Sequence, residues 1–67
     1  MTESQTIRLN CYVALCIDEE SHNPLGRETA RQGTVNESRA YAHSIGIPPD
    51  EIAGAVEAAI KQATKEE

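Results

Sequence analysis

Apolar and polar residues alternate without a break over the first third of the chain. The apolar residues occupy every odd-numbered position from 7 to 17: Ile7, Leu9, Cys11, Val13, Leu15 and Ile17. Successive side chains of a β-strand point to opposite faces, so a period of two is typical of a strand with one buried face. The pattern therefore predicts a long N-terminal strand over residues 6–17.

A single long strand needs a partner for its backbone N–H and C=O groups. The strand could pair in a hairpin with residues 27–35 or 39–47, or with the same strand of a second chain. The second chain would form a two-fold dimer. It would also enlarge a thin core, because the chain has no Phe or Trp and only twelve large aliphatic residues: six Ile, three Leu and three Val. We therefore expect a homodimer.

Helix signals dominate the second half of the chain. The segment from Thr34 to Glu37 fits a capping box, and Gly46 suits the position after a helix end. Residues 39–47 also alternate as a strand would, and 27–35 could be a short helix or a weak strand. The last helix is expected to begin at Pro49, with acidic residues in its first turn. Its apolar stripe comprises Ile52, Val56, Ala59 and Ala63.

These elements predict an α+β fold, in which one long strand is followed by a helical corner at about 35–45 and 49–64. We expect a single small domain over 6–64, a frayed N-terminus at 1–5 and a charged tail at 65–67. The first ten residues lack the basic and apolar regions of a signal peptide. No apolar run approaches the roughly 20 residues of a membrane span. We therefore expect a cytoplasmic protein without a membrane partner.

Residue chemistry argues against an enzyme. The two cysteines, Cys11 and Cys16, are five apart and the chain has only two histidines, which does not fit the usual spacing of zinc ligands. The four glycines are isolated, so there is no phosphate-binding loop. We expect no catalytic, metal or cofactor site.

Residues 38–56 carry the most specific pattern in the chain. Ala42, Gly46, Ile47 and Ile52 have the spacing of a tight corner between two helices. This segment resembles the helix-turn-helix family of DNA-binding regulators, and the resemblance implies DNA recognition by the second helix. That helix begins Pro-Asp-Glu here, where the family presents basic or amide side chains to the bases.

Charge makes a protein the preferred partner. The net charge is −5, with acidic ends around a slightly basic middle, and phosphate binding draws on Lys and Arg. We expect a non-enzymatic regulatory protein that binds a larger partner, as an inhibitor or adaptor of the phage or mobile-element type. The expected protein-binding residues are Arg8, Tyr12, Cys16, Asp50, Glu51 and Glu57. In the alternative DNA-binding function, the phosphate contacts are Arg27, Arg31 and Arg39.

Overall fold

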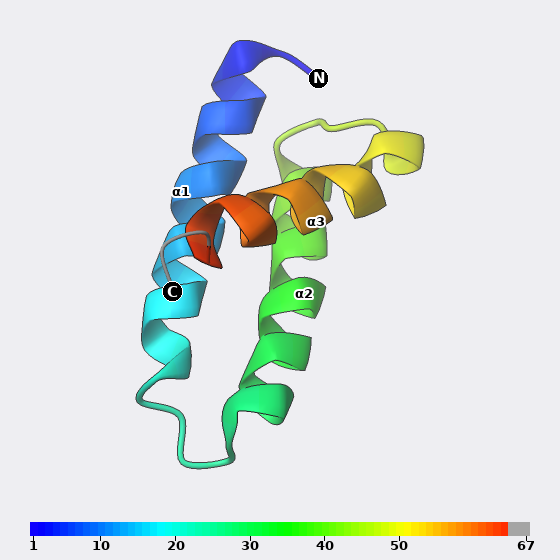
Figure 1. Cartoon of the computed structure of the whole chain (residues 1–67). Helices are drawn as coiled ribbons and strands as arrows, with labels where there is room; N and C mark the ends of the chain where they lie inside the picture. Colours follow the sequence, from blue (N-terminus) through cyan, green and yellow to red (C-terminus); the bar gives the residue numbers. More distant parts are fainter. Residues whose placement is uncertain (65–67) are drawn as a thin grey trace.

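The computed structural model describes residues 1–64, which form three helices: α1 (Glu3–Glu20), α2 (Arg27–Ser44) and α3 (Pro49–Thr64). Helices α1 and α2 run antiparallel side by side, and α3 crosses both of them (Figure 1). Residues 1–64 contain no strand. The prediction of an α+β fold with a strand over 6–17 is therefore wrong, and the fold is a three-helix bundle. The predicted charged tail at 65–67 lies outside the described residues.

Helix α1 begins with a capping box formed by Thr2 and Gln5. The Thr2 hydroxyl accepts a hydrogen bond from the Gln5 backbone N–H at 3.2 Å, and the Gln5 side-chain oxygen accepts one from the Thr2 N–H at 2.9 Å. These bonds satisfy two backbone donors that an uncapped helix leaves without partners. The capping box sets the start of α1 at Glu3, three residues before the predicted strand.

The alternation in α1 consists of two apolar stripes on opposite sides of one helix. Leu9, Val13 and Ile17 are spaced by four residues and are buried; we call them the inner stripe. The other apolar residues have the same spacing but are offset by two residues. Because an offset of two rotates a residue by about 200° around a helix, this second set lies opposite the core. The two sets interleave along the chain and read as a period of two.

Helix α2 is longer than predicted because it runs through the expected cap. It follows Gly26, which has φ +98°, and continues without interruption from Arg27 to Ser44. Thr34 is therefore an interior residue, and neither 27–35 nor 39–47 is a strand. The buried face of α2 consists of small residues four apart: Ala30, Thr34, Ser38 and Ala42. Such a face gives no apolar stripe in the sequence but lets a neighbouring helix pack closely.

The turn between α2 and α3 forms the predicted helical corner. Gly46 has φ +87°, a conformation that L side chains disfavour. The Gly46 N–H donates to the His43 carbonyl and the Ile47 N–H donates to the Ala42 carbonyl, both at 3.1 Å. This geometry buries Ile47 against Val56 of α3 in one apolar core. Helix α3 spans the residues predicted for the last helix.

The core combines the inner stripe of α1 with small and branched residues from the rest of the bundle. Its buried apolar members are Leu9, Val13, Ile17, Ala42, Ile47, Val56 and Ala59. Each helix satisfies its own backbone, so the unpaired strand that led us to expect a homodimer does not exist. Self-association of this fold would have to use the exposed surface of the bundle.

Candidate interaction surfaces

One side of α1 carries exposed apolar residues over most of its length. We call this side the outer stripe; its members are Ser4, Ile7, Cys11, Ala14, Leu15 and Asp18, and all of them are exposed. They lie within a sector of about 100° around the helix axis. The Ile7 side chain is 55% exposed and Leu15 is 67% exposed. Single exposed aliphatic residues are common, but Ile7 and Leu15 share one side of the helix with the exposed Cys11 and Ala14 between them. Such a grouped apolar surface is one that another molecule can cover.

Opposite charges lie toward the two ends of the outer stripe. Arg8 lies beside it in the N-terminal half of α1, and Asp18 and Glu19 lie at its C-terminal end. Arg8 makes no ion pair within residues 1–64. The surface therefore has an apolar centre, a basic group near one end and an acidic group at the other.

The first predicted binding surface is partly buried between helices of the bundle. Arg8, Tyr12 and Cys16 are four residues apart and form one ridge of α1, but only Arg8 is exposed. The Tyr12 ring stacks on Tyr41 of α2, with ring centroids 4.3 Å apart and planes 4° from parallel. Tyr12 and Cys16 are both half-buried. The Tyr12 ring therefore joins α1 to α2, and both side chains keep a part that is exposed.

The Cys16 thiol is poorly suited to act as a nucleophile. It lines a polar cleft of about 160 Å³ together with Glu19, Glu20 and Glu37. Burial raises the pKa of Cys16, and the charges of Glu37 and Glu19 raise it further. A catalytic cysteine needs the opposite, an electropositive setting that favours the thiolate.

The predicted acidic surface on α3 is exposed and partly engaged within the chain. Asp50, Glu51 and Glu57 are all exposed. The Glu51 carboxylate accepts a hydrogen bond from the Met1 amino group at 3.2 Å, and Glu57 pairs with Lys61 at 3.5 Å. Both pairs lie at the surface, where such contacts contribute little to stability. The face remains acidic and open to a basic partner.

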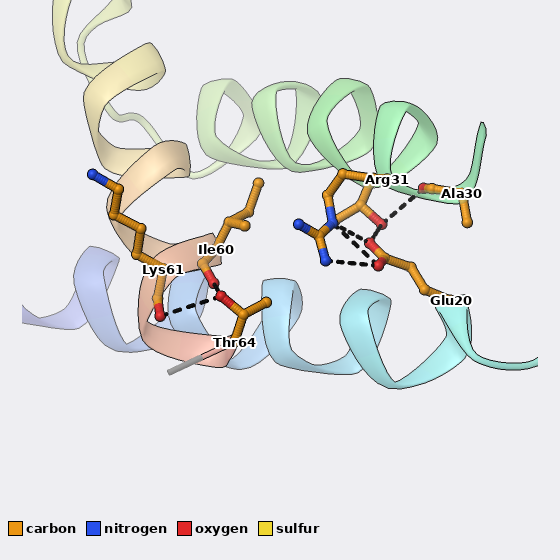
Figure 2. Close-up of polar contacts among 7 residues, drawn as sticks. Glu20, Ala30, Arg31, Ile60, Lys61 and Thr64 are labelled. Atoms are coloured by element: carbon orange, nitrogen blue, oxygen red, sulfur yellow. Dashed lines mark hydrogen bonds and ion pairs between the residues drawn. The ribbon is translucent and has the colours of Figure 1, made fainter. Parts of the chain in front are cut away.

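The three arginines of the DNA-binding alternative do not form one basic surface. The Arg31 side chain extends toward the C-terminal end of α1, where its guanidinium donates hydrogen bonds to the Glu20 carboxylate (Figure 2). The Nε–Oε2 distance is 2.8 Å and the Nη2–Oε1 distance is 3.0 Å. Arg27 and Arg39 are exposed at separate turns of α2. Two of the three predicted phosphate contacts therefore remain exposed, and they are twelve residues apart.

Glu20, the last residue of α1, is a buried charge. Its side chain is 6% exposed and also accepts a hydrogen bond from the Thr34 hydroxyl at 2.8 Å. Burial acts to raise the pKa of Glu20, but the hydrogen bonds from Arg31 and Thr34 and the charges of Arg31 and Arg27 outweigh it. The pKa is therefore below its usual value. In a helix, Glu20 follows Ile17 by three residues, and that spacing is the signal that places it on the buried face.

Other classes of site find no support within the described residues. Over residues 1–64, no three His, Cys, Asp or Glu side chains are grouped so that they could hold a metal ion. In the same part of the chain, every helix is too short or too polar to cross a bilayer. No protein-family model matches the chain, and no curated protein or solved structure shows significant similarity to it.

Proposed function

We propose that this chain is a small, non-enzymatic regulatory protein that acts by binding another protein through the outer stripe of α1. The observation that carries the proposal is the exposure of two large aliphatic side chains, Ile7 and Leu15, on one side of one helix. Covering such side chains contributes roughly 1–2 kcal/mol each. That amount is enough for two anchors to dominate a small helical interface.

The shape of the outer stripe suits recognition by a helix or a groove. Partners that bind a helix read anchors three, four or seven residues apart, and Ile7, Cys11 and Leu15 have this spacing. Ser4 and Ala14 are small, so they leave the surface between the anchors flat. The acidic residues Asp50, Glu51 and Glu57 offer a second contact for a basic partner, as an inhibitor or adaptor would require.

DNA binding is the weaker alternative. The corner between α2 and α3 supports it, because Gly46 and Ala42 occupy the positions that a helix-turn-helix needs. The acidic start of α3 weighs against it, since Asp50 and Glu51 would face phosphate groups. The engagement of Arg31 with Glu20 removes a further positive charge from the surface.

In-cell photo-crosslinking tests the proposed function. A photoreactive benzoylphenylalanine at position 14, in the middle of the outer stripe, is expected to form protein adducts in the cell of origin. The same residue at position 62, which is exposed on α3, is the matched control and is expected to form few. The double substitution Ile7→Asn and Leu15→Asn should abolish the adducts while circular dichroism shows an unchanged helical fold.

Adducts that are absent at position 14, or that persist in the double variant, would contradict this function. A mobility shift of duplex DNA by the purified chain that survives the double variant, but is lost on Arg27→Glu and Arg39→Glu, would favour the alternative.

A further inference from the structure

We infer that a second copy of this chain covers the outer stripe, with the two α1 helices packed antiparallel about a two-fold axis at Cys11. This inference rests on the proposed function for the choice of surface and adds the identity of the partner. It does not depend on the strand pairing that first suggested a dimer.

The outer stripe is complementary to itself when reversed. Cys11 is at its centre, Ile7 precedes it by four residues and Leu15 follows it by four. Antiparallel packing about Cys11 places Ile7 of one copy against Leu15 of the other, twice by symmetry. Ala14, between these anchors, is small enough to let the two helix backbones approach closely. The four exposed aliphatic side chains then cover one another without help from any other surface.

The flanking charges select the antiparallel orientation. In that orientation Arg8 of one copy lies about 6 Å along the axis from Asp18 of the other, which is within the reach of its side chain. Glu19 lies one residue beyond and adds to the attraction. A parallel pair would instead place Arg8 against Arg8 and Asp18 against Asp18. The antiparallel pair also aligns the two helix dipoles favourably.

The size of the surface implies a weak dimer. The 18 residues of α1 form a helix about 27 Å long. A standard stable interface buries about 800 Å² of surface on each partner, and one side of such a helix buries less. The net charge of −5 on each chain also opposes association. We therefore expect a dissociation constant of roughly 10–100 µM at physiological salt, with a monomer–dimer equilibrium that depends on concentration.

Sedimentation equilibrium of the purified chain tests for the dimer directly. Between 10 and 500 µM in reducing buffer, the mean mass should rise from near 7 kDa toward twice that value. Ile7→Asn or Leu15→Asn should keep the chain monomeric over this range. Leu25→Asn is the matched control, because Leu25 is an exposed aliphatic residue, 73% exposed, outside the stripe. This variant should dimerise as the original chain does.

Oxidative crosslinking tests the position of the two-fold axis. Helices packed 8–10 Å apart bring facing Cα atoms to roughly 4–5 Å, which is close enough for a disulfide. Copper-phenanthroline with oxygen as the oxidant takes two electrons and two protons from a pair of thiols and should link Cys11 to Cys11. The Cys16→Ser variant should give the same crosslinked dimer, and the Cys11→Ser variant should give none.

Charge reversal tests the orientation. Arg8→Glu and Asp18→Arg should each weaken the dimer about fivefold, since each turns two attractive pairs into repulsive ones. The double variant restores opposite charges and should recover the original affinity. A parallel dimer would not show this recovery. Glu28→Arg makes the same charge change as Asp18→Arg at an exposed position on α2 and should leave the dimer intact.

The outcomes separate this inference from the proposed function. A chain that stays monomeric at 500 µM and forms no Cys11 disulfide overturns the dimer. In that case, in-cell adducts from position 14 with a different protein would leave the proposed function standing. A monomeric chain that also forms no adduct from position 14 would contradict both the dimer and the proposed function.

Discussion

The inner and outer stripes of α1 are similar in chemistry and opposite in environment. Both have large apolar residues spaced by four, and they differ in sequence only by an offset of two positions. Leu9 and Val13 are fully buried, whereas Leu15 is 67% exposed. The small face of α2 and the apolar residues of α3 cover one stripe, and no residue from 1 to 64 covers the other. Apolar content alone therefore does not tell the core of a helical bundle from its contact surface.

The largest expected difference between the stripes is in the cost of truncation. Leu9→Ala leaves a cavity in the core and should lower the free energy of unfolding by about 2–5 kcal/mol. Leu15→Ala removes solvated atoms and should change it by less than about 0.5 kcal/mol in the monomer. Urea unfolding followed by circular dichroism at 5 µM compares the two. Equal losses of unfolding free energy in the two variants would mean that the outer stripe is buried like the inner one.

The second prediction concerns Glu20, which continues the inner stripe with a charge. Glu20→Gln keeps the shape of the side chain but weakens its bonds to Arg31 and Thr34. We expect a loss of about 1–3 kcal/mol in the free energy of unfolding at pH 7. Glu19→Gln, the same change at the exposed neighbouring position, is the control and should have little effect.

The stability that Glu20 contributes should also depend on pH. Because its pKa is lower in the folded chain than in the unfolded chain, this contribution is fully present above the unfolded pKa. It is lost as the pH falls through the folded pKa. The difference in unfolding free energy between the original chain and Glu20→Gln should therefore shrink on acidification from pH 6 to pH 2. A difference that stays constant over that range would contradict the assignment.

The smallest expected effect on stability comes from Ser38. This residue is part of the buried face of α2. Its side chain is 0% exposed, and its hydroxyl has no hydrogen-bond partner among residues 1–64. Ser38→Ala removes an unsatisfied polar group and improves helix propensity, so it should stabilise the chain by about 1 kcal/mol. Ser44 is exposed and donates to the Tyr41 carbonyl at 2.7 Å. Ser44→Ala should therefore not raise the melting temperature, which thermal unfolding of the two variants compares.

The N-terminal helix was missed for a physical reason. A helix with two apolar sides and a strand with one apolar face can produce the same alternation over a dozen residues. Two observations separate the possibilities in this sequence. Thr2 and Gln5 form a capping box directly before the apolar run, and a strand over 6–17 would be about twice the usual length. The sequence therefore contains local signals for a helix, although the period of two by itself indicates a strand.

The sequence predicts too short a second helix because the buried face of α2 is small and partly polar. Thr34 fits a cap in the sequence, and its hydroxyl instead bonds to Glu20 across the bundle. Such a contact joins residues fourteen apart and cannot be seen from local spacing. The last helix was placed correctly because its start and its apolar stripe are both local. Of the predicted binding residues, Tyr12 and Cys16 are half-buried, which local spacing cannot predict because burial depends on the register of α1 against α2.

The side chain of Gln5 links the N-terminal turn of α1 to the corner between α2 and α3, which lies at the same end of the bundle (Figure 1). Its oxygen caps α1 through Thr2, and its nitrogen donates to the carbonyl of Ile45, forty residues away, at 3.1 Å. Terminal helical turns usually open independently of the rest of a protein, so their amide protons exchange rapidly with solvent. Here such opening must also release the corner between α2 and α3. Amide exchange in the first turn of α1 should therefore be slow and should match that of the corner, which makes this turn and the corner one cooperative unit.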